Sequence, residues 1–253
     1  MVECEGGEGS KLRAAMAEKP GVTTLSPLLS ITSVTEVVYE HLRRQILRGM
    51  DPGQALRLNT LAAELGVSTT PVRMALERLS ADGLVLQEGR RGATVAPLSL
   101  DDFQDIYAVR RCLEGEAARL GTERMSEGER LRMREVASAL DGVVCSKRVD
   151  LDQYLEAEWE MHDLCYQASH HKLMLAEIRS FRRRAERYFR LALAGGMTVL
   201  EDLDQQRAFC DACVEGDWAG AEARAVSLLD WTVERVVPIL RDSGAIAKDR
   251  MSS

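Results

Sequence analysis

The chain has 253 residues, and its 33 Lys and Arg against 40 Asp and Glu give a formal net charge of −7. A composition of 45% hydrophobic and 29% charged residues excludes fibrous and intrinsically disordered classes and is typical of a helix-rich globular protein. The length favours two domains. The acidity is uneven, because residues 33–97 hold 8 basic and 7 acidic side chains whereas residues 98–253 hold 22 and 29. A local basic face on the middle segment would therefore be sufficient to meet nucleic-acid phosphates.

The six cysteines show no spacing typical of a disulfide framework. No apolar stretch approaches the roughly 18 residues of a membrane span, and the N-terminal stretch lacks the apolar run of a signal peptide. We therefore expect a cytoplasmic protein with reduced thiols and no membrane partner. Cys210 and Cys213 form a C-x-x-C pair without further ligands, which we interpret as two small side chains on a helix.

Residues 1–32 are rich in Gly, Glu, Ser and Pro without periodicity, and we expect a flexible arm there. Ser33, with Glu36 three residues later, is a capping signal, and the following apolar spacing predicts a helix that ends at Gly49. Residues 54–58 are expected to form a short extended stretch.

Two short helical patterns joined at Gly66 predict a helix-turn-helix over residues 59–79. Val67 would fill the gap between the two helices, and Ser68 would cap the second one. Three residues near the start of the second helix face outward, where such a helix reaches base edges in the major groove: Thr69, Thr70 and Arg73.

Residues 83–97 contain two short β-prone runs around a glycine-flanked basic tip, a pattern that predicts a β-hairpin wing. Arg90 and Arg91 at this tip would reach the DNA backbone or the minor groove. The order of helix-turn-helix and wing indicates a winged helix-turn-helix domain over residues 33–97.

The strings LAAELGVSTTPVRMALERLSADGLV and RRGATV resemble the winged-helix domain of the GntR family. The resemblance implies a set of DNA-contacting residues: Asn59, Thr69, Thr70, Arg73, Arg90 and Gly92. In that family the residue after Val-Ser is commonly arginine, whereas here it is Thr69. We therefore do not expect the usual operator sequence of the family.

From Ser99 onward the pattern is helical, with capping signals in Ser99 and Ser126. The predicted helices cover residues 100–121, 126–145, 150–169, 171–194, 199–215 and 217–240. The predicted fold class is mainly α, with an N-terminal winged helix-turn-helix (α+β) followed by an all-α six-helix effector-binding bundle and a flexible tail over 243–253.

Residues 100–242 resemble the helical effector domain, called FCD, of the FadR branch of the same family. The resemblance is carried by the string RRCLEGEAA, residues 110–118, which matches an R-x-x-L-E-x-x-A-A pattern. It implies ligand binding and dimerisation by the helical domain.

Many FCD domains bind a divalent metal through an Asp and a His four residues apart, together with two later histidines. Here Glu158 and His162 occupy the first two places, but Gln206 and Leu228 occupy the others. Leucine cannot coordinate a metal, so we expect no cofactor and an effector that is recognised in another way, with a divalent metal at the remaining residues as the disfavoured alternative. The predicted effector-binding residues are Arg110, Glu158, His162 and Gln206.

A further arginine cluster on the fourth bundle helix is interpreted mainly as a solvated face, with an inward-pointing member as the alternative: Arg182, Arg183, Arg184, Arg187 and Arg190. The expected effector is a small organic acid or a lipid-like molecule. The predicted function is a DNA-binding transcription regulator, a repressor that reads an inverted repeat as a homodimer. An alternative is a metal-dependent enzyme that uses Glu158 and His162, although no nucleophile or phosphate loop accompanies this pair. A scaffold without sequence preference on DNA is a third possibility.

Overall fold

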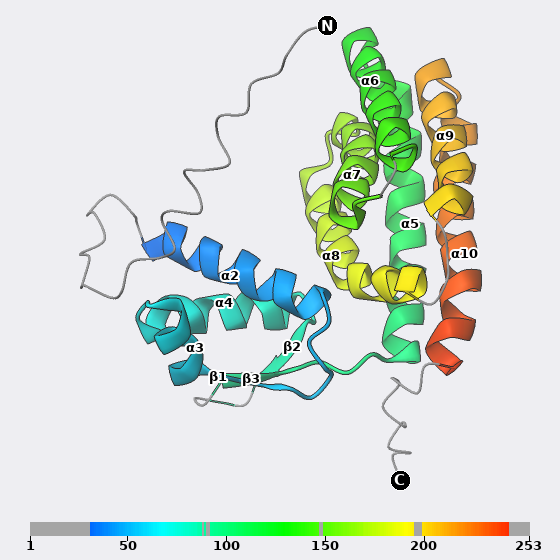
Figure 1. The fold of residues 1–253 in the computed structure, drawn as a ribbon. Helices are drawn as coiled ribbons and strands as arrows, with labels where there is room; N and C mark the ends of the chain where they lie inside the picture. Colours follow the sequence, from blue (N-terminus) through cyan, green and yellow to red (C-terminus); the bar gives the residue numbers. More distant parts are fainter. Residues whose placement is uncertain (1–30, 88, 90–91, 147–148, 195–198, 243–253) are drawn as a thin grey trace, which may run out of the picture.

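The computed structural model describes residues 31–87, 89, 92–146, 149–194 and 199–242 of the chain. Two domains are visible in Figure 1, a small one with helices and a sheet and a larger one made of helices. The small domain contains, in chain order, α2 (Ile31–Leu47), β1 (Ala55–Arg57), α3 (Leu58–Leu65), α4 (Thr69–Ala81), β2 (Val85–Gln87) and β3 (Gly92–Val95). Its three strands form an antiparallel sheet in the order β1-β3-β2.

The helices of the small domain bury one apolar stripe each, as the sequence pattern predicts. Leu42 of α2 and Val72 and Leu79 of α4 are completely buried in a shared core. The turn after α3 is made by Gly66, whose φ of 63° lies in the left-handed region that favours glycine. Ser68 stands at the N-cap of α4, but its side chain makes no capping hydrogen bond.

The start of α2 differs from the prediction, because the helix begins at Ile31, two residues before the expected cap at Ser33. The predicted arm over 1–32 and the predicted tail over 243–253 fall almost entirely outside the described residues.

The larger domain consists of α5 (Leu100–Arg124), α6 (Glu127–Val144), α7 (Leu151–Ala168), α8 (Lys172–Ala194), α9 (Val199–Glu215) and α10 (Trp218–Asp242). These bounds agree with the six predicted helices to within three residues. The predicted capping signals are both used: the Ser99 side chain accepts from the backbone N–H of Asp102, and Ser126 forms a reciprocal capping box with Glu129. Among the described helices, none combines the length and the hydrophobicity that spanning a bilayer requires.

The two domains meet where α2 approaches α8 (Figure 1). Arg43 of α2 pairs with Glu186 of α8. A second pair has its arginine on the larger domain: Arg183 of α8 lies 3.0 Å from the carboxylate of Asp82 at the end of α4. Arg187 donates to the backbone carbonyls of Ala96 and Pro97, at 3.2 and 3.0 Å.

These contacts correct the interpretation of the arginine cluster as mainly a solvated face. Arg183 and Arg187 instead bond to the small domain, and Arg184 and Arg190 pair with carboxylates of the bundle. Arg182 points into the bundle, as described below. The physical reason is that α8 lies at the edge of the bundle that the small domain covers, so its polar side faces carboxylates and carbonyls rather than solvent alone.

Candidate DNA-reading surface and effector cavity

The predicted reading residues lie at the start of α4 and of α3. Thr70, Arg73 and Asn59 are exposed, and Thr69 is half-buried. In the part of the chain that the structure describes, none of these four side chains makes a hydrogen bond or an ion pair. They are therefore available to DNA without the loss of an internal contact.

Of the residues predicted to contact DNA from the wing, the structure describes only Gly92. Arg90 and Arg91, predicted at its tip, lie outside the described residues. Gly92 is buried, with a φ of 139°, and a Cβ atom there would lie 2.1 Å from the carbonyl oxygen of Leu56. The structure thus gives Gly92 a structural reason to be glycine, the close approach of β3 to β1, and contact of this residue with DNA stays a prediction.

Sequence reasoning missed Arg57, the last residue of β1, which is exposed and pairs with Gly92 of the wing in the sheet register. Other arginines of the small domain are engaged, since Arg78 pairs with Glu36 and Arg48 pairs with Asp152. Three arginines of this domain have no ion-pair partner among the described residues: Arg44, Arg57 and Arg73. Arg57 and Arg73 therefore add to the positive charge available at the reading surface.

The predicted effector residues come from three helices and meet inside the bundle. Arg110 lies on α5, Glu158 and His162 on α7, and Gln206 on α9, and all four are buried. Leu228 of α10 completes the wall of the same cavity, at the fourth place of the metal set implied by the resemblance.

A chain of polar contacts connects these side chains. Arg110 donates to Glu114 at 2.5 Å, and the hydroxyl of Tyr166 donates to the same carboxylate at 3.0 Å. Nδ1 of His162 lies 3.1 Å from the Tyr166 hydroxyl, and its Nε2 lies 2.7 Å from Oε1 of Gln206. Each nitrogen of the buried imidazole thus lies within hydrogen-bond distance of a polar side chain, and a neutral ring donates at only one of them.

A second ion pair closes the cavity on the side of α8. Arg182, the inward-pointing member of the arginine cluster, donates to Glu158 at 2.6 Å. Burial is the largest single effect and opposes the ionisation of Glu158, but the nearby positive charges, of which Arg182 is the foremost, together outweigh it and hold the pKa of the carboxyl below its usual value. Burial lowers the pKa of His162, which favours the neutral imidazole at pH 7.

The cavity is closed in this structure. Its open volume is about 10 Å³, room for about one water molecule. Two arginines and two glutamates fill the remaining space as mutual partners, so their charges balance. A ligand of any size must therefore displace some of these contacts, and an anion is the class that the two guanidiniums would accept in place of a glutamate.

The side chains do not fit a divalent metal. One oxygen of Glu158 is engaged by Arg182, Gln206 offers only an amide, and Leu228 offers no donor. Among the described residues, no group of three His, Cys, Asp or Glu side chains is placed to hold a metal ion. The guanidinium of Arg182 supplies a positive charge at the carboxylate that a metal would otherwise contact.

Sequence reasoning missed Glu114 and the hydrogen bonds of Tyr166 in this network, and it left open which arginine of the cluster points inward. The i, i+4 spacing of Arg110 and Glu114, and of His162 and Tyr166, was a usable signal, because such pairs share one helix face. No comparable local signal identifies Arg182, since its neighbours in the sequence are also arginines.

A winged helix with a free reading helix, joined to a helical domain with a closed polar cavity, defines a class of protein: a DNA-binding regulator with a ligand-responsive domain. Comparisons with known proteins agree. Residues 34–95 match the model of the bacterial regulatory proteins of the gntR family, and residues 105–230 match the FCD domain.

Two relatives and one solved structure illustrate the similarity. The uncharacterized HTH-type transcriptional regulator BphR of Paraburkholderia xenovorans is 28% identical, over 87% of this chain and 90% of its own. The HTH-type transcriptional repressor GlaR of Escherichia coli is 27% identical, over 86% and 99%. The structure of E. coli McbR/YncC covers 85% of this chain and 100% of its own, with a TM-score of 0.70 and 20% identity, and shows the same fold. The chain belongs to the GntR family of transcriptional regulators and carries an FCD effector domain.

Proposed function

We propose that this regulator is a cytoplasmic repressor that reads an inverted repeat as a homodimer. The observation that carries the proposal is the reading helix α4, which presents Thr70 and Arg73 to solvent without internal partners. The two-fold symmetry of a dimer would place two such helices one turn of DNA apart. The name of a full-length relative, a transcriptional repressor, supports the direction of regulation.

Footprinting on DNA upstream of the gene itself tests this function. Protection of a palindromic sequence at moderate salt is expected, and the absence of any protected palindrome would refute the proposal.

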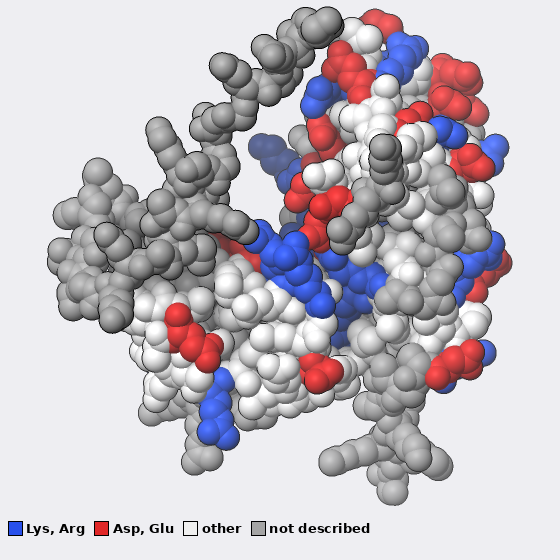
Figure 2. Space-filling view, viewed as in Figure 1, with Lys and Arg blue, Asp and Glu red and all other residues white. Residues whose placement is uncertain are grey.

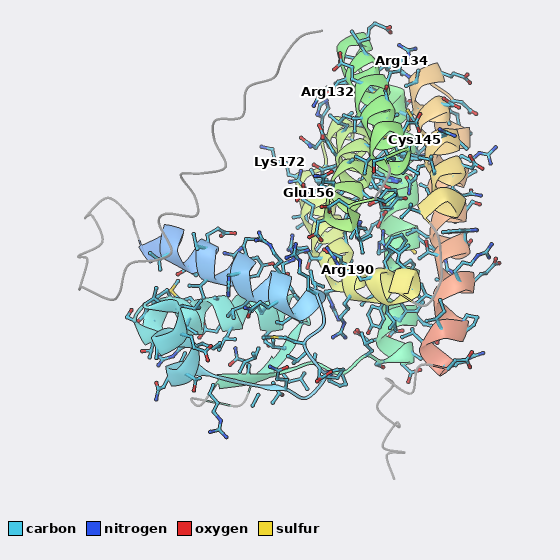
Figure 3. All side chains as sticks on the ribbon, in the orientation of Figure 1. Arg132, Arg134, Cys145, Glu156, Lys172 and Arg190 are labelled. Carbon is cyan, nitrogen blue, oxygen red and sulfur yellow. The ribbon has the colours of Figure 1, made fainter. Side chains whose placement is uncertain are left out.

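Arg73→Ala should weaken specific binding by about 1–3 kcal/mol if the guanidinium contacts a base. Arg132→Ala is the matched control, since Arg132 lies on α6 at the end of the bundle remote from the small domain (Figure 3). An equal loss on all sequences would make Arg73 a phosphate contact.

We infer that the buried cavity binds a small organic acid without a resident metal. Arg110 and Arg182 supply the positive charge, and Leu228 and Leu229 supply an apolar wall. A carboxylate of the ligand would replace Glu158 or Glu114 as the partner of a guanidinium, a substitution that exchanges one charge-assisted hydrogen bond for another.

A thermal-shift screen of organic acids on chelator-treated protein tests the cavity. A stabilising acid should lose its effect in Arg110→Gln and keep it in Arg132→Gln. Titration with zinc or nickel is the counter-test, and tight stoichiometric binding would overturn the proposal of a metal-free site.

We also propose that the Glu158 and His162 pair has no catalytic role. Both nitrogens of His162 are within hydrogen-bond distance of fixed side chains, and Glu158 is the partner of Arg182. The residues that line the cavity include no Ser, Cys, Thr or Lys among the described positions, so no hydroxyl, thiol or amine nucleophile of these types stands beside the pair.

A further inference from the structure

A second and larger cavity lies between the two domains. Its volume is about 590 Å³, and α2, α7 and α8 line it. Figure 2 shows Lys and Arg side chains gathered in the hollow where the domains meet, with acidic side chains beside them. Seven arginines and five carboxylates line this interdomain cleft: Arg43, Arg44, Arg48, Arg179, Arg182, Arg183 and Arg190, with Glu40, Asp150, Asp152, Glu156 and Glu186.

The centre of the cleft is a chain of ion pairs. Glu186 is shared by Arg43 of α2 and Arg190 of α8, and Asp152 is shared by Arg190 and Arg48, the residue after α2. Arg43 also lies 3.9 Å from the carboxylate of Glu40. Three guanidiniums thus share three carboxylates. Figure 3 shows Arg190 at the point where α8 lies near the C-terminal end of α2.

Two further donors have no partner. Arg44, one helical turn before Arg48, is exposed and makes no ion pair or hydrogen bond with the described residues. Nε of Arg43 is buried and has no hydrogen-bond partner in the part of the chain that the structure describes. A buried N–H without an acceptor is costly, and an acceptor that enters the cleft would remove that cost.

The other arginines of the cleft have acidic partners outside its lining. Arg179 pairs with Asp163, Arg182 with Glu158 and Arg183 with Asp82. They therefore frame the cleft, and Arg44 is the arginine of its lining that has no ion-pair partner among the described residues.

The size and walls of the cleft suit a small molecule. Ligand cavities in proteins commonly have volumes of about 300–1,000 Å³ and combine apolar walls with a few charged groups. Leu47, Leu155 and Trp159 supply apolar surface here. Trp159 and Arg182 also line the inner cavity, so the two cavities are neighbours.

We propose that the interdomain cleft is a second ligand site, specific for a small organic polyanion that carries two or more carboxylate or phosphate groups. Such a ligand supplies the acceptors that Nε of Arg43 and the guanidinium of Arg44 lack. Because Arg43 and Arg44 belong to α2 whereas Arg190 belongs to α8, the bound polyanion connects the DNA-reading domain to the effector domain. The site is distinct from the buried cavity and does not depend on the effector proposed for it.

Isothermal titration of the full-length protein tests the site, with citrate and inorganic pyrophosphate as probes at constant ionic strength. We expect saturable binding of at least one probe, one per chain. The variant Arg44→Gln removes a side chain without internal contacts, and Arg44→Gln/Arg48→Gln also removes one ion pair with Asp152. The affinity of the double variant for the probe should fall at least about tenfold, since it loses two charge-assisted contacts. Arg132→Gln should bind as the wild type does.

Arg110→Gln separates the cleft from the inner cavity, because Arg110 lines only the latter. Retained binding of the probe in Arg110→Gln, with weakened binding in Arg44→Gln, supports the proposal. Absence of saturable binding by the wild type overturns it. So does the converse pattern, in which Arg110→Gln abolishes binding and Arg44→Gln does not. Operator binding is measured separately, by footprinting without citrate or pyrophosphate, so a failure of the proposed DNA-binding function can be told apart from a failure of this site.

Discussion

Gly121 of α5 is the position where a single methyl group has the most predictable effect on stability. A Cβ atom there would lie 2.0 Å from the carbonyl oxygen of Cys165 and 3.2 Å from its sulfur. Contacts below 3.0 Å essentially never occur for Cβ atoms, so Gly121→Ala forces α5 and α7 apart by at least about 1 Å. Overpacking of this kind costs about 1–3 kcal/mol, and the better helix propensity of alanine recovers up to about 1 kcal/mol. We expect a net loss of about 1–2 kcal/mol.

Gly142 of α6 provides the matched control. It is also a helical glycine, but a Cβ atom there meets no other atom within 4 Å. Gly142→Ala should therefore stabilise the protein by about 0.5–1 kcal/mol through helix propensity alone. Urea unfolding followed by circular dichroism measures both free energies of unfolding. If Gly121→Ala is as stable as Gly142→Ala, the close packing of α5 on α7 is refuted.

Three further predictions concern the small domain and the thiols. Tyr39→Phe removes the hydrogen bond of 2.5 Å from the hydroxyl to the buried carboxylate of Asp82, and urea unfolding should show a loss of about 1–2 kcal/mol; an unchanged midpoint would contradict it. Gly92→Ala meets the carbonyl of Leu56 and should distort the wing, so operator binding in a gel-shift assay should weaken while the helical domain melts normally. Burial raises the pKa of the Cys210 thiol to about 11, so its alkylation in the folded protein should accelerate only as the pH approaches that value. At pH 8, peptide mapping by mass spectrometry should find modification at the exposed thiols and not at the buried ones: Cys112 and Cys145 against Cys165, Cys210 and Cys213.

The elements that follow from local rules were predictable from the sequence. The helix between Ser126 and Cys145 is defined by a capping box and an apolar period, both of which act over a few residues. The turn at Gly66 depends on one backbone angle that glycine adopts readily. The convergence of Arg110, Glu158 and His162 at one cavity, with Gln206 behind His162, was also anticipated, although not from periodicity.

The features that depend on packing between distant segments were not predictable. The arginines of α8 have the same local pattern whether they face solvent or another domain, and only the approach of the small domain decides between the two. The reason for glycine at position 92 is the carbonyl of Leu56, a residue of another strand. The occupation of the Glu158 carboxylate by Arg182 likewise requires α7 and α8 to be placed side by side.

The coupling of effector and DNA binding is constrained by two neighbouring residues of α8. Adjacent residues of a helix project about 100° apart, which allows Arg182 to enter the buried cavity while Arg183 contacts Asp82 of the reading domain. A ligand shifts an equilibrium only through contacts that differ between two states. A ligand that takes the place of Glu158 at Arg182 changes the forces on α8 next to the contact with the reading domain. A ligand that pairs only with Arg110 of α5 leaves Arg182 and Glu158 in contact, and it would bind without a direct effect on the junction.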